Sequence, residues 1–512
     1  MTATATDEQQ PAPLAELVDI TKTYPNGVVA LRGVDLALRT GEVHALVGEN
    51  GAGKSTLVKV LFGLESATGG HVRLHGETLT RHDPSIAIEA GIGMVHQHFK
   101  LVPSLTAAEN LVLGDEPRRR GLFDRRVARR SLTALAEQLG VHIDPDARVA
   151  DLAVGDQQRL EIMKALHRGA NILILDEPTA VLTPQEADRL LESVRGLADA
   201  GTGVVFITPK LREVMVVADT VTVLRDGRRV TAVPRAEATI DGLARAMVGR
   251  DVEAPRRDAT VGVGAPRLTV SGVRTGGPGR GRLQGIDLVI NRGEIVGVAG
   301  VEGNGQDDLV DVITGLRPAA AGTVTLDSHD ITDWSPLQRR RAGIAHIAAD
   351  RMRRGVAPDA SIAENVTADR VDTRYSHRGV LDRAAIAAAG HGAIARYEIR
   401  AEDSDMPVWS LSGGNMQKVV VARELDHDPP VVIAAHPTRG VDLGAMALIH
   451  EVLLRRRSAG AAVLLVSSEL DELRRLSDRI VVLSDGQLVA SFDHPANVAD
   501  EDLGRAMAGV VR

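Results

Sequence analysis

The chain carries two kinds of hydrophobic pattern. Three short segments, residues 43–47, 172–175 and 203–207, are apolar at nearly every position. Runs of this kind are typical of parallel strands that are buried on both faces. Residues 14–38 instead alternate well enough to predict antiparallel strands, with a turn at the Pro-Asn-Gly sequence of 25–27. The pattern therefore predicts an α/β core accompanied by an antiparallel sheet.

The segments between these runs predict the remaining elements. A further strand ends in the polar residue Gln97. Residues 104–149, rich in Ala, Leu and Arg, are predicted to be mostly helical, and they include basic runs at 118–120 and 125–126. Runs of like charge usually form a solvated face. A hairpin around Asp226-Gly227 closes the block.

The block then occurs a second time. Residues 299–305 resemble the stretch around Gly48, and residues 503–509 resemble 243–249, in both cases roughly 250 to 260 positions downstream. This near-constant spacing indicates a duplicated domain, because the period of a solenoid is far shorter.

The duplication sets the predicted domain boundaries. We predict a first domain over residues 14–250 and a second over residues 267–512. The linker between them, residues 251–266, is rich in Pro, Gly and charge.

Composition narrows the function classes. The net charge is −8, which argues against nucleic acid as the main partner. Because the chain has no cysteine, disulfides, cysteine nucleophiles and thiolate metal sites are excluded. No apolar run approaches the ~18 residues of a membrane span, and residues 1–13 lack the features of a signal peptide. We expect a protein of the cytosol, or one held at a membrane by its partners.

The stretch after the first buried strand fits the phosphate-binding pattern G-x-x-x-x-G-K-[ST] and precedes a predicted helix. Its residues are Gly48, Glu49, Asn50, Gly51, Ala52, Gly53, Lys54, Ser55 and Thr56. Glycines let backbone N–H groups point at phosphate oxygens, and the helix adds its positive N-terminal end. Lys54 is predicted to reach the β- and γ-phosphates, and Ser55 to place its hydroxyl on Mg²⁺.

A second candidate site element is Asp176-Glu177 at the end of a buried apolar strand. A carboxylate there is unfavourable unless it has a partner such as Mg²⁺. We interpret Asp176 as a Mg²⁺-site carboxylate and Glu177 as the group that polarises the attacking water. The alternative is that both acidic residues are merely exposed at the strand end.

Between these two motifs lies Leu152-Ala153-Val154-Gly155, and the second block has Leu411-Ser412-Gly413-Gly414 at the matching place. The second sequence closely resembles the signature of ATP-binding cassette (ABC) ATPases. Alone, a Ser-Gly-Gly turn that opens a helix is a common N-cap. Here the sequence lies between a phosphate loop and a following buried strand, and it does so in both blocks, which is specific to this family. The resemblance covers nearly the whole chain from Leu14 onward.

The resemblance implies two tandem P-loop α/β domains, each with an antiparallel β subdomain and a helical subdomain. In that family two cassettes stack head to tail, with ATP between the P-loop of one and the signature of the other. It implies that Ser412, Gly413 and Gly414 complete the site of Lys54. Tyr24 is similar to the residue that stacks on adenine. Gln97 is similar to a glutamine that contacts Mg²⁺ and takes part in catalysis.

The second block keeps its signature but departs from the family pattern in its phosphate loop and at the carboxylate and glutamine positions. Gln306 and Asp307 stand where the first block has Lys54 and Ser55, and the other replacements are Ala435 for Asp176, His436 for Glu177 and Ala349 for Gln97. A carboxylate such as Asp307 repels triphosphate. Ala153 of the first signature also lacks the serine hydroxyl. We therefore expect one competent site and one structural site.

Pro209 occupies the place of the switch histidine that contacts the γ-phosphate in the family, and Ser468 stands there in the second block. Proline offers neither a side-chain donor nor an N–H. We expect ATP hydrolysis to be reduced rather than absent.

Fused cassettes with a degraded second copy resemble the ATPase subunit of nucleoside and simple-sugar importers. That resemblance implies separate permease chains, an extracytoplasmic binding protein, and a peripheral position at the cytoplasmic face of the cell membrane, with no nucleic-acid partner. The segments around residues 94–99 and 174–183 favour nucleosides over sugars. The alternatives are a non-hydrolysing, ATP-dependent scaffold and a soluble tandem cassette that acts on ribosomes. Cargo selection lies in other chains, so this sequence does not identify the cargo.

Overall fold

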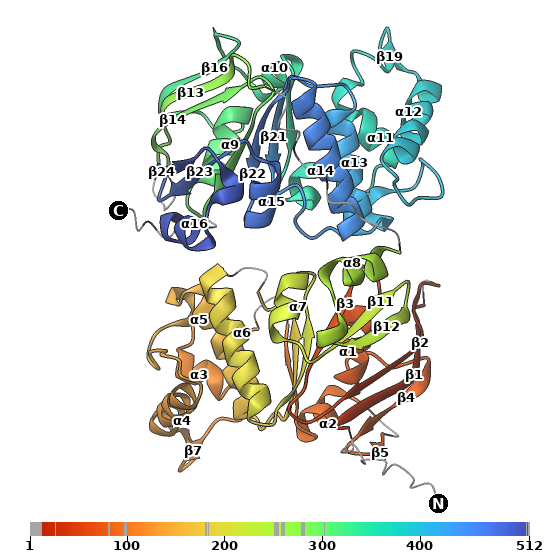
Figure 1. The fold of residues 1–512 in the computed structure, drawn as a ribbon, viewed down its shortest axis with the longest axis vertical. Helices are drawn as coiled ribbons and strands as arrows, with labels where there is room; N and C mark the ends of the chain where they lie inside the picture. The colour runs from red at the N-terminus through yellow and green to blue at the C-terminus, as the bar shows by residue number, and fades with distance from the viewer. Residues whose placement is uncertain are drawn as a thin grey trace, which may run out of the picture. The chain divides into compact units, whose positions relative to one another are not determined.

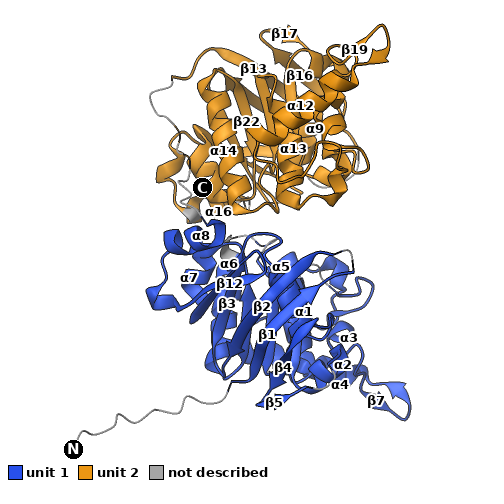
Figure 2. Cartoon of the chain, turned by 90° about the vertical axis from the view of Figure 1, so that its right-hand side faces the viewer, with its two compact units in different colours: residues 1–252 blue, residues 253–512 orange. Residues whose placement is uncertain are grey.

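The computed structural model describes residues 13–25, 27–79, 82–96, 100–179, 182, 184–249, 255, 257, 262–277, 282–301, 303–507 and 509. The chain divides into two compact units, residues 1–252 and 253–512, and each has hydrophobic clusters of its own (Figure 2). Most of the predicted linker, 251–266, lies outside the described residues. No helix in the described part of the chain is long and apolar enough to cross a membrane.

The first unit is built on a six-stranded sheet in the order β12-β11-β3-β10-β9-β6 (Figure 1). In chain order its strands are β3 (Val43–Gly48), β6 (Ile92–Val95), β9 (Ile172–Asp176), β10 (Gly203–Ile207), β11 (Thr220–Arg225) and β12 (Arg228–Pro234). Neighbouring strands are parallel except for the hairpin β11–β12. The central strands β3, β9 and β10 are buried on both faces, which explains their continuous apolar sequences.

A four-stranded antiparallel sheet, in the order β2-β1-β4-β5, lies beside this core, as the alternating pattern of residues 14–38 predicts. Its strands are β1 (Ala15–Thr23), β2 (Val29–Leu38), β4 (Gly69–Leu74) and β5 (Glu77–Thr78). The core helices are α1 (Lys54–Leu61), α2 (Pro84–Glu89), α6 (Pro184–Asp199), α7 (Leu211–Val217) and α8 (Ile240–Val248).

The helical subdomain of the first unit differs in one part from the sequence prediction. It contains α3 (Ala107–Leu111), α4 (Arg125–Gln138) and α5 (Val154–His167), but residues 118–123 form a small hairpin of β7 (Arg118–Arg119) and β8 (Leu122–Phe123). The prediction of a mostly helical segment is wrong there because Arg120 and Gly121 both adopt positive φ, at 53° and 82°. Two such residues make the tight turn that suits a two-residue hairpin.

The second unit repeats this architecture. Its main sheet has the order β18-β21-β22-β15-β23-β24 and its antiparallel sheet the order β14-β13-β16-β17. The strands are β13 (Pro266–Arg274), β14 (Gln284–Asn291), β15 (Ile295–Ala299), β16 (Ala321–Leu326), β17 (His329–Asp330), β18 (Ile344–Ile347), β19 (Ser376–His377), β20 (Val380–Leu381), β21 (Val431–Ala435), β22 (Ala462–Val466), β23 (Arg479–Ser484) and β24 (Gln487–Phe492). The helices are α9 (Gln306–Thr314), α10 (Pro336–Arg341), α11 (Ile362–Thr367), α12 (Arg383–Arg396), α13 (Gly413–Leu425), α14 (Leu443–Ser458), α15 (Leu470–Leu476) and α16 (Asp500–Met507). The predicted fold class, two tandem α/β domains with antiparallel and helical subdomains, is confirmed.

Candidate functional site

The phosphate loop of the first unit connects the buried strand β3 to helix α1, as the motif requires. Gly53 is the N-cap of α1 and has a φ of 104°. A Cβ at this position would lie 2.7 Å from the carbonyl oxygen of Ala30, so only glycine fits the turn without strain. The loop is also supported from the β11–β12 hairpin, since the Gly227 N–H donates to the carbonyl of Ala52 at 3.2 Å.

Lys54 lies inside the loop that precedes it and is 6% exposed. Its Nζ donates to the carbonyl oxygens of Gly48 at 2.7 Å and Glu49 at 3.0 Å. Burial lowers the pKa of Lys54, and the charges of Glu177, Asp176 and Glu49 oppose this shift. The loop thus holds a cation whose hydrogen bonds are to backbone carbonyls and not to a carboxylate, which suits a group that is to bind phosphate.

Asp176 ends β9, and Ser55, at the start of α1, is among the groups that act on its carboxylate. Burial raises the pKa of Asp176, while the charges of Lys54, His96 and Lys59 and the Ser55 hydrogen bond lower it. A partly buried carboxylate beside a hydroxyl provides the oxygen ligands that Mg²⁺ prefers. The residues present therefore fit the predicted magnesium site.

Glu177 follows directly and has a φ of 50°, in the left-handed region. Its N–H donates to the carbonyl of Ile207 at 2.9 Å, which ties the residue to the end of β10. Burial raises the pKa of Glu177, and the adjacent charge of Asp176 raises it further against the effects of Lys54 and Lys210. A carboxylate with a raised pKa is a better base toward water than an exposed one.

The segment after β10 is anchored by a buried carboxylate. Glu213 on α7 accepts hydrogen bonds from Thr179 and Thr208, both at 2.8 Å. Pro209, the next residue after Thr208, is exposed. Lys210 follows, with its Nζ 3.8 Å from Glu213. The segment is therefore held close to Glu177, while the switch position carries no side-chain donor.

The remaining predicted contacts of the first unit are partly described. The Tyr24 hydroxyl lies 3.3 Å from Oγ1 of Thr56, and the Nζ of Lys22 lies 5.1 Å from the centre of the Tyr24 ring. The aromatic ring is thus placed next to the phosphate loop. Gln97, predicted as a Mg²⁺ contact and a catalytic residue, lies outside the described residues.

The two signature sequences open corresponding helices with different caps. Ser412 is the exposed N-cap of α13, and its Oγ accepts from the backbone N–H of Asn415 at 3.4 Å and from the Asn415 side chain at 2.9 Å. Ala153 is the N-cap of α5 and has no side-chain cap. Only the second signature therefore presents a hydroxyl at the start of its helix.

A family model, "ABC transporter", matches residues 31–180 and 283–439. The matched ranges contain both phosphate loops and both signatures, and they cover more than half of the chain. The chain belongs to the ABC transporter family. It is an ATP-binding protein with two fused cassettes, which confirms the resemblance in the sequence.

Relatives match this chain along its whole length. It is 42% identical to the guanosine import ATP-binding protein NupO of Bacillus subtilis (strain 168) over 496 residues, covering 96% of this chain and 97% of the relative. It is also 42% identical to the glucose import ATP-binding protein TsgD13 of Haloferax volcanii over 529 residues, covering 97% and 96%.

One solved structure shares the tandem architecture. It is the complex of the archaeal ribosomal stalk protein aP1 with the archaeal ribosome recycling factor aABCE1, with a TM-score of 0.63 and 18% identity, covering 96% of this chain and 92% of that one. At this level of identity the likeness shows the fold alone.

In the second cassette, groups of the same cassette bond to the residues at the start of α9, where the first cassette has Lys54 and Ser55. Gln306 is buried, and its Nε2 donates to the carbonyl of Val301 at 3.1 Å. The neighbouring Asp308 accepts from Thr275 at 2.7 Å and Arg317 at 2.6 Å. Arg282 also pairs with Asp308, at 3.3 Å. These bonds fix the start of α9 to the residues around it.

The residues that support the segments next to Asp176 and Glu177 were not identified from the sequence. Glu213, Thr179 and Thr208 form the buried group that fixes the end of β10, and His96 acts electrostatically on Asp176. One signal was present in the sequence, because Thr438 and Glu472 of the second cassette stand at the positions of Thr179 and Glu213, and the structure shows that they form the same bond, at 2.8 Å. A polar pair that is kept in both copies of a duplicated domain indicates a structural contact.

Proposed function

We propose that this chain is the ATPase subunit of an importer whose cargo is a nucleoside or a simple sugar. One observation carries the proposal. The first cassette assembles Lys54, Ser55, Asp176 and Glu177 around one loop, in a chain that is similar from end to end to import ATP-binding proteins. We assign the cassettes to residues 14–250 and 267–512, joined by a linker at 251–266.

The proposed chemistry follows from the charges at the site. Lys54 binds the β- and γ-phosphates, while Glu177 accepts hydrogen bonds from the attacking water and orients it. Ser55 and Asp176, together with Gln97, would hold Mg²⁺, which neutralises phosphate charge when bound. The remaining loop residues, Gly48 to Gly53 and Thr56, supply backbone N–H groups to the phosphates.

Two further contacts complete the proposed ATP site. Tyr24 stacks on the adenine ring, an arrangement supported by its position beside Thr56. Ser412, Gly413 and Gly414 contact the γ-phosphate when two cassettes close head to tail on ATP. The exposed Ser412 hydroxyl and the N-terminal end of α13 support this assignment.

An importer ATPase works with membrane partners. We propose that permease chains bind this protein at the cytoplasmic face of the cell membrane, and that an extracytoplasmic binding protein delivers the cargo to the permease. Nucleic acid has no part in this function.

Reconstitution tests the proposal. The chain is co-purified with the permease encoded beside it, placed in vesicles, and assayed for ATP hydrolysis and for uptake of labelled nucleosides and sugars. Uptake of either class that depends on ATP supports the proposal. The control Glu177→Gln should bind ATP and fail to hydrolyse it. If neither the permease nor the cargo changes the rate of ATP hydrolysis, the coupling to import is refuted.

A non-hydrolysing scaffold is the second candidate, and Pro209 is the observation that favours it. Under this alternative the complete transporter binds ATP at Lys54 but does not hydrolyse it. It then releases phosphate no faster than the Glu177→Gln variant does. Turnover above that level excludes the scaffold.

A further inference from the structure

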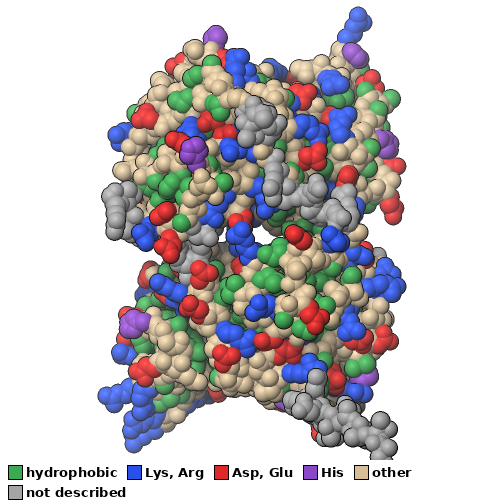
Figure 3. Space-filling view, in the orientation of Figure 1, with side chains coloured by type: hydrophobic (Ala, Val, Ile, Leu, Met, Phe, Trp, Pro, Cys, Tyr) green, Lys and Arg blue, Asp and Glu red, His purple; other side chains and the backbone are tan. Residues whose placement is uncertain are grey.

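The basic runs of the sequence gather on one small structure that the ATPase site does not use. Residues 118–130 comprise the β7–β8 hairpin and the first turns of α4, and we call them the basic hairpin. Figure 3 shows the resulting group of Lys and Arg side chains at the lower left, where Figure 1 places β7. All the arginines of the basic hairpin are exposed, and they are Arg118, Arg119, Arg120, Arg125, Arg126, Arg129 and Arg130.

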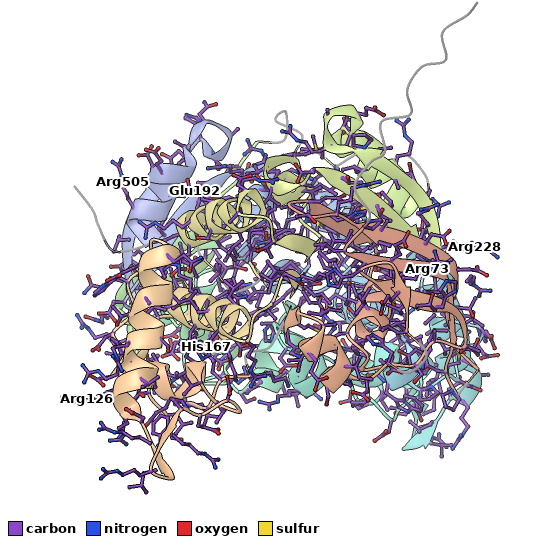
Figure 4. The ribbon with its side chains drawn as sticks, turned by 90° about the horizontal axis from the view of Figure 1, so that it is seen from below. Arg73, Arg126, His167, Glu192, Arg228 and Arg505 are labelled. Atoms are coloured by element: carbon purple, nitrogen blue, oxygen red, sulfur yellow. The ribbon has the colours of Figure 1, made fainter. Side chains whose placement is uncertain are left out.

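Most of this charge takes no part in holding the fold together. Arg125 pairs with Glu109 at 3.1 Å, and Arg129 pairs with Asp146 at 2.9 Å. Both pairs are at the surface, where such contacts add little stability. Within the described residues the other five arginines of the basic hairpin form no ion pair. Figure 4 shows Arg126 at the outer side of α4. A chain with a net charge of −8 thus concentrates unpaired positive charge at one place.

The second cassette provides an internal control for what the fold requires. It has the same hairpin, β19–β20, which is followed by an Asp cap and a helix, as Asp124 precedes α4 and Asp382 precedes α12. Five of the seven arginine positions carry other residues there, namely Ser376, His377, Ala384, Ala387 and Ala388. The same structure therefore forms without the arginines, which indicates that they serve an interaction.

The second strand of the basic hairpin, β8, is apolar and exposed. Leu122 is 75% exposed and Phe123 is 37% exposed, between arginines on both sides. Exposed apolar side chains within a basic surface suit the boundary of an anionic bilayer, because guanidinium groups bind phosphate while the apolar side chains enter the acyl region. Nucleic acid would use the arginines but would leave Leu122 in water.

We propose that the basic hairpin binds anionic phospholipid head groups, with Leu122 and Phe123 at the edge of the hydrocarbon layer. The proposal rests on the proposed function, since an importer ATPase works beside a membrane. Its test uses the isolated full-length chain without ATP or permease, so its failure is distinct from a failure of ATP hydrolysis or transport.

The experiment is flotation with lipid vesicles. The chain should float with vesicles of phosphatidylcholine mixed with phosphatidylserine and not with phosphatidylcholine alone, and added salt should weaken the binding. The test variant carries the residues of the second cassette, namely Arg118→Ser, Arg119→His, Arg126→Ala, Arg129→Ala and Arg130→Ala. At roughly fivefold per arginine, the five changes together should lower partitioning by roughly 3,000-fold. The same arginines changed to Lys should retain most of the binding.

Further variants separate the two components of the surface. Leu122→Asn should weaken partitioning several-fold, whereas the matched change Val380→Asn in the second hairpin should have no effect. Unchanged ATP binding at Lys54 and unchanged melting confirm that each variant is folded.

Three results would overturn the proposal. The first is equal flotation with neutral and anionic vesicles, and the second is full binding by the five-arginine variant. The third is tighter binding to duplex DNA than to the vesicles with no effect of Leu122→Asn, which would identify a nucleic-acid surface instead.

Discussion

Replacing Pro209 with histidine is expected to raise the rate of ATP hydrolysis. Lys54, Asp176 and Glu177 already lie close enough to act on one another's charge. Pro209 follows Thr208, whose hydroxyl is held by Glu213 at 2.8 Å, and it is exposed, so a larger side chain has room. A histidine there adds a donor at the end of β10, beside the strand that carries Glu177.

The expected size of the effect follows from the bond that is added. A hydrogen bond to a charged group contributes about 1.5–3 kcal/mol, and about 1.4 kcal/mol corresponds to a tenfold change in rate. We therefore expect kcat to rise by roughly 10- to 100-fold. The Michaelis constant for ATP should change little, because the added bond forms mainly with charge that develops during the reaction.

The measurement is steady-state phosphate release by the complete transporter. Proline also fixes φ, so a change in backbone freedom could alter the rate by itself. Pro209→Ala is the control, because it relaxes the backbone and adds no donor. Equal rates for the histidine and alanine variants would refute the reasoning, since the missing side chain would then not limit hydrolysis.

The other predictions concern the asymmetry between the cassettes and the state of the catalytic carboxylate. Equilibrium binding of Mg-ATP should show one tight site per chain, which Lys54→Ala abolishes and Gln306→Ala leaves unchanged; two equal sites would contradict this. Ser412→Ala should lower turnover by about 1–3 kcal/mol of transition-state stabilisation, whereas Ala153→Ser should leave it nearly unchanged, and the reverse ranking in a coupled ATPase assay would refute the assignment of the competent site. Burial and the charge of Asp176 raise the pKa of Glu177 above the ordinary 4.5. Because the carboxylate must be ionised to act as a base, kcat should begin to fall at a pH higher than 4.5 as the solution is made more acidic. A rate profile that is flat down to pH 4.5 would exclude Glu177 as the titrating base.

The fold was largely predictable because its signals are local. The runs of β3, β9 and β10 are apolar on both faces, and the sequence around Asp226-Gly227 specifies a tight turn with φ values of 50° and 74°. The hairpin at 118–123 was not predicted. Its turn uses Arg120 at positive φ, and arginine gives no sign of that conformation in a sequence.

The site was predictable where a motif specifies contacts between neighbours in the chain. Lys54 meets the carbonyls of Gly48 and Glu49, within its own loop. Contacts that join distant segments were not predictable, since Thr179 and Glu213 meet only after β9 and β10 pair. The same two residue types recur at the same spacing in the second copy, as Thr438 and Glu472, but that spacing alone does not show that the two side chains meet.

The second cassette lacks the phosphate-binding lysine but keeps a hydrogen bond from the side chain at that position to the loop. Its loop has lost the lysine, yet Gln306 still bonds to a loop carbonyl, as Lys54 does in the first cassette. Asp308, also on α9, bonds to Thr275, Arg282 and Arg317, so its charge is compensated by these side chains, whereas Asp307 is exposed at the position of Ser55. A buried charge without a partner would be strongly destabilising. The loop of the second cassette is therefore held by hydrogen bonds and ion pairs of that cassette although it lacks the lysine. This arrangement is expected if the second cassette contributes its signature helix, and no ATP of its own, to the competent site.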